Sequence, residues 1–512
     1  MAIKPTLSSP CFPPTKTRVH LSVSHQKQAK IIKMSPSLHS PPSNPRYTTI
    51  TTPSSAVTIL SKATILPDQK SNGDLLKLSV SDLPMLSCHY IQKGLFFPPP
   101  PIPIRSLLPL LTHSLSRALS AFPALAGRLY TDSDGHIFIS CTDTGVDFSF
   151  AVAPSLTLPI LLPPSSDVPL QVKSLFSLDG AGSFDGHFLP IAAFQLTELG
   201  DGSIFLACSV SHAVVDGTSL WNFFNAWAEL SRSPAIAALS RPPDFRRNFF
   251  LESSAVLRFP GGIPPIVTFP IDAPLRERIF HFTSKTIREL KYKANRRTQI
   301  SEISGKSILS RKQDNEISSF QSLCAMLWRS VTRARKHLAA TEPTTFRMAV
   351  NCRRRVVPAV DERYFGNAIQ SIPTTAAVGE VEKRELWWTA RLLHRSVVAH
   401  DDATIKRGVA EWEAAPRCFP LGNPNGAGIT MGSSPRFPMY EGNDFGWGGP
   451  VAVRSGRANK FDGKISAFPG RDGVGSVDLE VCLEPATMAA LLEDNEFMSY
   501  VSETKVEAIE AI

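Results

Sequence analysis

The residues of this chain best suited to chemistry are His212, Asp216 and Gly217, which stand in the pattern His-x-x-x-Asp-Gly. An imidazole with an ordinary pKa of about 6.5 accepts a proton readily at neutral pH, so His212 is a candidate general base. The Asp216 carboxylate either orients this histidine or stabilises a turn. From these residues alone, a buried structural histidine beside a turn-forming aspartate is an equally good interpretation. A metal site is less favoured, because no second cluster of His or Cys has ligand spacing.

The elements that must position His212 can be predicted from its neighbours. Residues 204–210 are a short, uncharged apolar run, which predicts a buried strand. In the Asp-Gly turn Gly217 can adopt positive φ, and Thr218 or Ser219 can cap the helix that follows. We therefore expect His212 at the end of a rigid strand, where a side chain is held still and can reach a substrate. The apolar face of the predicted helix carries Leu220, Phe223, Phe224 and Trp227.

A second motif, Asp-Phe-Gly-Trp-Gly at 444–448, lies in a loop with five glycines between positions 432 and 449. Together with the His212 motif it resembles the plant BAHD acyl-CoA-dependent acyltransferases. The resemblance runs from about Ala56 to Ser502, and the two motifs in this order are highly specific. Shorter segments similar to recurring segments of that family are Leu125–Leu129, Tyr364–Asn367, Val451–Gly456, Asn459–Gly463 and Val477–Val481. The segments most similar to a poorly characterised, acetyltransferase-like branch are Ser79–Met85 and Phe461–Ile465.

The resemblance implies an α/β protein with mixed, α+β-type sheets and the two-lobed chloramphenicol-acetyltransferase-like fold. In that fold a channel between the lobes holds the active site, with acyl-CoA entering from one face and the acceptor from the other. We place the lobes at 56–235 and 273–505. They are joined by a Pro- and Arg-rich crossover at 236–272, and a disordered basic extension at 1–55 precedes them.

The resemblance also implies a reaction, the transfer of an acyl group other than an amino-acyl group from coenzyme A to a small specialised metabolite. The acceptor is a hydroxyl or an amine, and His212 is the general base of a direct, ternary-complex reaction. A covalent acyl-enzyme is not expected. Strand alternation puts Ser209 and Ser211 on the side opposite His212, and Cys208 lies too far along the strand to exchange a proton with it.

In the family, the aspartate equivalent to Asp216 is thought to be structural and paired with an arginine. Arg276 and Arg278, at the start of the second lobe, are the candidates here. Arg353 begins a basic run that follows a predicted strand. We interpret this run as a solvated strand end, with a contact to a coenzyme A phosphate as the alternative.

The family treats the second motif as mainly structural or coenzyme-supporting, although its aspartate is sometimes assigned a catalytic role. Asp444 is therefore retained as a second catalytic candidate. Trp447 is a candidate substrate-binding residue that donates its indole N–H toward the acyl group, but simple packing is favoured. The glycines expected to have structural roles at the site are Gly217, Gly446 and Gly448.

Several elements away from these motifs are also predicted from hydrophobic periodicity. A half-exposed strand is expected at 477–483, because apolar residues alternate with polar ones there. A polar, basic segment at 296–315 is expected to be a mobile loop. The predicted helices are Ile104–Phe122, Lys285–Asn295, Ser318–His337 and Ala486–Tyr500.

The composition, with 43% hydrophobic and 19% charged residues, is typical of a soluble globular enzyme. No run of 18 apolar residues is present, so no membrane span is expected. The net charge of +9 is concentrated before Asp68, where eight of the 54 basic residues and no acidic ones lie. The remaining 46 basic residues nearly balance 45 acidic ones, which argues against a nucleic-acid-binding protein. Eight cysteines without a Cys-x-x-Cys pair favour reduced thiols over disulfides or zinc.

We therefore expect a cytoplasmic monomer whose partners are acyl-CoA and a small-molecule acceptor, with no metal or cofactor beyond that co-substrate. Residues 1–55 leave a plastid location open, because their composition also matches a transit peptide. One alternative function is an inactive relative that acts as a ligand-binding or scaffold protein, although His212 is retained. Another is an acyltransferase that draws on a carrier protein, a class that shares the His212 motif but is not expected to carry the motif at 444–448.

Overall fold

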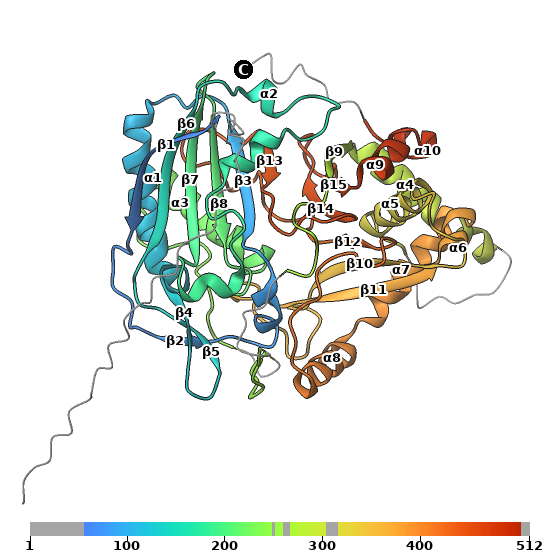
Figure 1. Ribbon diagram of the computed structural model, residues 1–512, viewed down its shortest axis with the longest axis horizontal. Helices are drawn as coiled ribbons and strands as arrows, with labels where there is room; N and C mark the ends of the chain where they lie inside the picture. The colour runs from blue at the N-terminus through green and yellow to red at the C-terminus, as the bar shows by residue number, and fades with distance from the viewer. Residues whose placement is uncertain (1–55, 248–250, 260–266, 304–315, 503–512) are drawn as a thin grey trace, which may run out of the picture. The chain divides into compact units, whose positions relative to one another are not determined.

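Two six-stranded sheets form the framework of this computed structural model (Figure 1). The structure describes residues 56–247, 251–259, 267–303 and 316–502, without the side chains of 297–303. The disorder expected for 1–55 lies outside the described residues.

The first sheet has the order β1-β6-β7-β8-β3-β13, and only β6 and β7 run parallel among its neighbouring strands. Its strands are β1 (Thr58–Ile65), β3 (Ile91–Phe97), β6 (Val146–Ala153), β7 (Ala192–Leu199), β8 (Ile204–Val210) and β13 (Ala452–Ser455). A separate three-stranded sheet contains β2 (Leu75–Lys77), β4 (Arg128–Thr131) and β5 (Ile137–Ser140).

The second sheet has the order β11-β10-β12-β14-β15-β9, with β12 parallel to both of its neighbours. Its strands are β9 (Arg276–Phe282), β10 (Pro343–Asn351), β11 (Ile369–Ala377), β12 (Ile429–Met431), β14 (Lys464–Pro469) and β15 (Val477–Leu483). Parallel and antiparallel pairs occur in both large sheets, which confirms the mixed sheets expected from the sequence.

The helices pack against the two large sheets (Figure 1). The α-helices are α1 (Ile104–Ala121), α2 (Leu158–Leu161), α3 (Gly217–Arg232), α4 (Ser284–Ile303), α5 (Ser319–Ala334), α6 (Val378–Lys383), α7 (Leu386–Ala399), α8 (Asp402–Ala414), α9 (Pro485–Leu492) and α10 (Asn495–Met498). Short 3₁₀ helices are η1 (Leu83–Ser87), η2 (Pro123–Ala126), η3 (Leu170–Leu175) and η4 (Ser183–His187).

Each sheet has its own hydrophobic core. The core of the first sheet includes the apolar faces of α1 and α3, whose contact is fixed by the Trp227 indole N–H donating to the carbonyl of Leu111 at 3.2 Å and to Ser114 Oγ at 3.0 Å. The second core contains α5, which packs against α4, α6, α7 and α9. We call the first sheet with α1, α3, η1 and η4, whose apolar residues share its core, the first half, and the second sheet with α4, α5 and α7 the second half.

One strand crosses between the halves. β13 comes late in the chain, after five of the six strands of the first sheet and four of the second, yet it pairs with β3 at the edge of the first sheet. The chain therefore returns to the first half before it completes the second sheet. The lobe boundaries at 235 and 273 stay a prediction.

Three local predictions were wrong. All seven residues of β15 are buried, so its alternating polar side chains do not face water. α4 continues to Ile303, through the start of the segment expected to be a loop, and residues 304–315 lie outside the described residues. The last predicted helix is divided into α9 and α10, because the Asp494 side chain accepts the N–H of Phe497 and caps a new helix.

Candidate active site

His212 lies between the end of β8 and the start of α3, and its backbone is held from both halves of the protein. Its N–H donates to Ser183 Oγ, in η4 of the first half, at 2.9 Å. Its carbonyl accepts from Asn367 Nδ2, just before β11 of the second half, at 2.7 Å. Because both backbone groups are bonded, the position of the imidazole depends on how the two halves meet.

Asn367 is in turn fixed by Asp82, a fully buried carboxylate. Asp82 Oδ1 accepts from the backbone N–H of Asn367 at 2.8 Å and from its Nδ2 at 2.9 Å. Asp82 Oδ2 accepts from the N–H of Ser79 at 2.8 Å and from its hydroxyl at 2.7 Å. Both residues lie in segments with family resemblance, but sequence reasoning gave neither a role. The signal was their place in those segments, since nothing local predicts a contact across 285 residues.

The surroundings of His212 favour its neutral form. Burial lowers the pKa of the imidazole, and the positive charge of Lys464 lowers it further, whereas the negative charge of Asp216 raises it. The net direction is downward, so the imidazole is neutral and able to accept a proton at pH 7.

Asp216 pairs with Arg353, and not with either arginine proposed from the sequence. Arg353 Nη1 lies 2.6 Å from Asp216 Oδ2, and its Nη2 lies 3.1 Å from Oδ1. Both side chains are only 1% exposed. Although burial alone would raise the pKa of the Asp216 carboxyl, Arg353 and the surrounding hydrogen bonds hold it below its ordinary value. Arg276 and Arg278 instead contact Asp167, at 2.7 and 3.5 Å.

Within the basic run, the two interpretations are wrong for Arg353, whereas its neighbour Arg354 is exposed as expected of a solvated strand end. The Arg353 guanidinium is fully buried and paired with Asp216. It is therefore not solvated, and it is not available to a coenzyme A phosphate. Its Nη2 also donates to the carbonyls of Tyr364 and Gly366, at 3.1 and 3.0 Å. The Asp216–Arg353 pair therefore joins the start of α3 to the second half beside His212.

Asp216 is itself the N-cap of α3, a role that the sequence analysis gave to Thr218 or Ser219. Its Oδ1 accepts the N–H of Ser219 at 2.9 Å. Gly217 is the first residue of the helix and does not have positive φ. A glycine is needed there for space, because an added Cβ would lie 2.5 Å from the ring of Phe437.

The chain from Phe437 to Phe445 runs along the whole length of α3. It starts with the ring of Phe437 against Gly217. Asn225 Nδ2 then donates to the carbonyls of Pro438 and Glu441, at 3.2 and 3.3 Å. Ser231 Oγ donates to the carbonyl of Phe445 at 2.8 Å. Ser231 lies 14 positions after Gly217, a distance of about 21 Å along the helix at ~1.5 Å per residue, so the second motif lies at the end of α3 far from His212.

Asp444 organises this second motif. Its Oδ1 accepts the N–H groups of Gly446 and Gly448, at 2.8 and 2.9 Å, and its carbonyl accepts from Arg232 at 3.1 Å. Gly446 and Gly448 have φ of 111° and 106°, a region that favours glycine. The structure therefore brings the Asp444 carboxylate onto its own loop and does not bring it to His212.

Trp447 lies in an aromatic cluster in the same loop. Its ring stacks on Phe445 with the centroids 5.4 Å apart, and meets Phe97 edge-on at 5.9 Å. These contacts are those of a packed side chain.

The nucleophilic side chains nearest to His212 in the sequence are committed elsewhere. Ser209 Oγ donates to the carbonyl of Ser177 at 2.5 Å, and Ser211 Oγ donates to the carbonyl of Ser183 at 3.3 Å. Burial raises the pKa of the Cys208 thiol to about 12, which leaves little thiolate at neutral pH.

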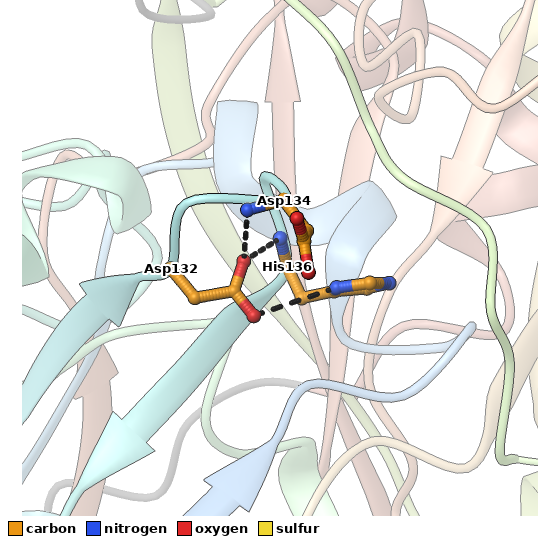
Figure 2. A group of neighbouring side chains, drawn as sticks. All are labelled: Asp132, Asp134 and His136. Atoms are coloured by element: carbon orange, nitrogen blue, oxygen red, sulfur yellow. Dashed lines mark hydrogen bonds and ion pairs between the residues drawn. The ribbon is translucent and has the colours of Figure 1, made fainter.

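Within the described residues, one group of potential metal ligands comes together, Asp132, Asp134 and His136 (Figure 2). These residues form the turn between β4 and β5. Asp132 Oδ1 accepts the N–H groups of Asp134 and His136 at 3.0 and 2.8 Å, and its Oδ2 lies 3.5 Å from the His136 ring (Figure 2). The turn itself accounts for the arrangement, and we assign no metal to it.

Comparison with known proteins places this geometry in a family. The family model described as "Transferase family" matches residues 55–498. The BAHD acyltransferase DCR of Arabidopsis thaliana is 32% identical over 469 residues, which cover 86% of this chain and 92% of that protein. The chain belongs to the BAHD acyltransferases. An uncharacterised acetyltransferase of Arabidopsis thaliana is 31% identical, over 86% of this chain and 98% of that one.

Two solved structures have the same fold as this chain. Vinorine synthase matches with a TM-score of 0.66 and 21% identity, over 87% of this chain and 98% of that chain. The TRI101 protein of F. graminearum, complexed with coenzyme A and deoxynivalenol, matches with a TM-score of 0.67 and 18% identity, over 84% and 99%. These likenesses confirm the two-lobed fold expected from the resemblance.

As a BAHD acyltransferase, the chain moves an acyl group from coenzyme A to a small-molecule acceptor. Among the described residues, no helix combines the length and apolar character needed to cross a membrane.

Proposed function

We propose that His212 is the general base in a direct transfer of an acyl group from a coenzyme A thioester to a hydroxyl or amine of a small specialised metabolite. The acceptor oxygen or nitrogen attacks the thioester carbonyl while its proton passes to the imidazole. The carbon–sulfur bond then breaks, and the proton returns to the coenzyme A thiolate. No group other than these two substrates and the imidazole is needed to balance the step.

The observation that carries this proposal is the fixation of a neutral His212 at the junction of the two halves. Ser183 holds its N–H and Asn367 holds its carbonyl. Burial lowers the pKa of the imidazole, which keeps it unprotonated at neutral pH. A histidine held in this way has a fixed backbone and an imidazole that can accept a proton, which supports its role as a general base.

The other candidate residues are proposed to act through the fold. Asp216 and Gly217 shape the start of α3, while Asp444, Gly446 and Gly448 shape the loop at its far end. Asp444 is thus proposed as a structural residue and not as a second catalytic group. We propose that Trp447 is a packing residue, because its ring stacks on Phe445 in the same loop.

We further propose a cytoplasmic monomer that needs acyl-CoA as a co-substrate and uses no metal. A plastid location remains the alternative if residues 1–55 act as a transit peptide. A screen of acetyl-, malonyl- and hydroxycinnamoyl-CoA against a panel of alcohols and amines, with released thiol as the readout, would identify the donor and acceptor.

The direct mechanism is tested by varying both substrates. We expect initial-rate plots to intersect, because both substrates must be bound before the acyl group moves. Intact-mass measurement after incubation with acyl-CoA alone should show unmodified protein, because the hydroxyls of Ser209 and Ser211 donate to backbone carbonyls and burial raises the pKa of the Cys208 thiol. Parallel plots, or an acyl adduct that is discharged by adding the acceptor, would replace this mechanism with a ping-pong one.

A further inference from the structure

A cavity of about 350 Å³ lies in the first half, in a part of the fold that neither motif reaches. Ser149 of β6 and Gln195 of β7 line it and are paired in the sheet, and Lys62 of β1, which is paired with Ser149, lines it as well. These three strands form the edge of the first sheet that lies away from β13 (Figure 1). Residues of the segment 174–178 complete the lining.

The cavity is separate from the candidate active site. Phe194, which precedes Gln195 in β7, belongs to the core shared with α1 and α3, so Gln195 faces the other side of the sheet. Gln195 is paired with Ala207, three positions before the end of β8, which is about 10 Å along the strand. Ser149 lies two strands across the sheet from Ala207, which is about 10 Å in the other direction. A ligand in this cavity would therefore not lie against His212.

Ser149 differs from the other polar residues of the lining, whose side chains have partners within the protein. Lys62 and Asp147 form an ion pair at 2.8 Å, and Ser177 Oγ donates to Gln195 Oε1 at 3.0 Å. The Ser149 residue is only 3% exposed, and its hydroxyl makes no hydrogen bond to any residue that the structure describes. This hydroxyl is therefore left for a group inside the cavity.

We propose that this cavity binds a neutral small molecule that carries hydroxyl groups on a ring. A hydroxyl group both donates and accepts hydrogen bonds, so it matches the Ser149 hydroxyl and the amide N–H of Gln195 that Thr197 leaves uncommitted. A neutral ligand fits because the two charged residues of the lining already neutralise each other. The inference goes beyond the proposed function and does not depend on it.

The remaining lining and the size of the cavity agree with such a ligand. Phe176, Leu178, Val57 and Ile59 supply apolar surface for the carbon face of a ring. An apolar lining with a few placed polar groups is typical of small-molecule sites, which have volumes of about 300–1,000 Å³. The cavity is at the small end of that range, so we expect it to hold one or two rings.

The binding test is a ligand-observed NMR titration of the full chain with phenyl β-glucoside, which combines a hydroxylated ring and an apolar ring. We expect saturable binding that is tighter than that of glucose or phenol alone, because each of these fills only part of the lining. The anionic phenyl β-glucuronide is the matched charged probe. It should bind more weakly, because Lys62 is already paired with Asp147 and leaves no cation for the carboxylate.

Two variants locate the binding. Ser149→Ala should weaken the binding of phenyl β-glucoside by about threefold to tenfold, because one hydrogen bond is lost. Its matched control is Ser61→Ala, an exposed serine of β1 outside the lining. Ser174→Trp should abolish binding, because this exposed residue of η3 lines the cavity and a large ring there would fill it. Gln171→Trp, exposed on the same helix outside the lining, should leave binding unchanged.

The melting temperature of Ser149→Ala gives a readout without a ligand. It should be close to or above that of wild type, because the variant removes a hydroxyl that has no partner in the described fold. A clear fall would show that Ser149 has a structural role and would contradict the proposal. It would also be overturned if wild type showed no saturable binding of phenyl β-glucoside, or if the binding were the same in Ser174→Trp as in Gln171→Trp.

Discussion

At the residue scale, the position of His212 depends more on the residues that hydrogen-bond to its backbone than on the other residues of its motif. The motif identifies the histidine. Asn367 of the second half donates to the His212 carbonyl, and Asp82 fixes Asn367 in turn. Asp216 is bonded to Arg353 and caps the start of α3, so it is a structural neighbour of the proposed base. A small displacement of a catalytic group costs much of its rate advantage, so we expect the Asn367 contact to affect the rate if His212 is the base.

Replacing Asn367 with alanine tests this positioning role. We expect kcat to fall by up to about 100-fold, while KM changes little and the pH at which the rate rises stays the same, because His212 remains the base. Asn225→Ala is the matched control, since that amide also bonds distant carbonyls but lies further along α3. An equal loss of kcat in the two variants would argue that Asn367 acts through stability alone.

At the element scale, local periodicity predicted β8, α1, α3 and α5 well. The apolar residues of each element lie close together in the sequence, at the spacing expected of a buried strand or a helix face. It failed for β15. There Asp478 is bonded to His281, and Glu480 to Lys460, so polar residues are buried with partners from other segments. An alternating pattern is the same for a solvated face and for a buried face with paired charges, so the sequence alone cannot separate them.

His281 joins β9 to β15 and to the turn between β14 and β15, and it gives a pH-dependent prediction. Its Nδ1 lies 2.5 Å from Asp478 and its Nε2 lies 2.8 Å from Asp472. Burial alone would lower the pKa of the imidazole, but the two carboxylates raise it above its ordinary value. The fold therefore stabilises the protonated ring. This contribution is complete below the unfolded pKa of about 6.5 and is lost as pH rises through the folded pKa.

We therefore expect the melting temperature of wild type to exceed that of His281→Gln by more at pH 6 than at pH 8.5. Thermal unfolding of both proteins at several pH values measures this difference. The exposed His113→Gln on α1 should show no such trend. A constant difference between wild type and His281→Gln across pH would contradict the assignment of a protonated His281.

At the scale of the whole molecule, the candidate site is made where the two halves meet. The contacts that make it join residues far apart in the chain, such as Asp216 and Arg353, which are 137 residues apart. The family resemblance predicted that the halves would meet at His212, but the residue patterns could not predict which arginine or which amide would reach it. The path of 437–445 along α3 likewise explains how the second motif supports the site without lying in it.

The central claim, that His212 is the general base, is tested most directly by the kcat/KM of His212→Ala with an active donor and acceptor. We expect a loss of about 10²–10⁴-fold with a melting temperature close to that of wild type, because the variant removes the proton acceptor while Ser183 and Asn367 still hold the backbone. A folded His212→Ala protein that keeps more than about a tenth of the wild-type kcat/KM would contradict this claim.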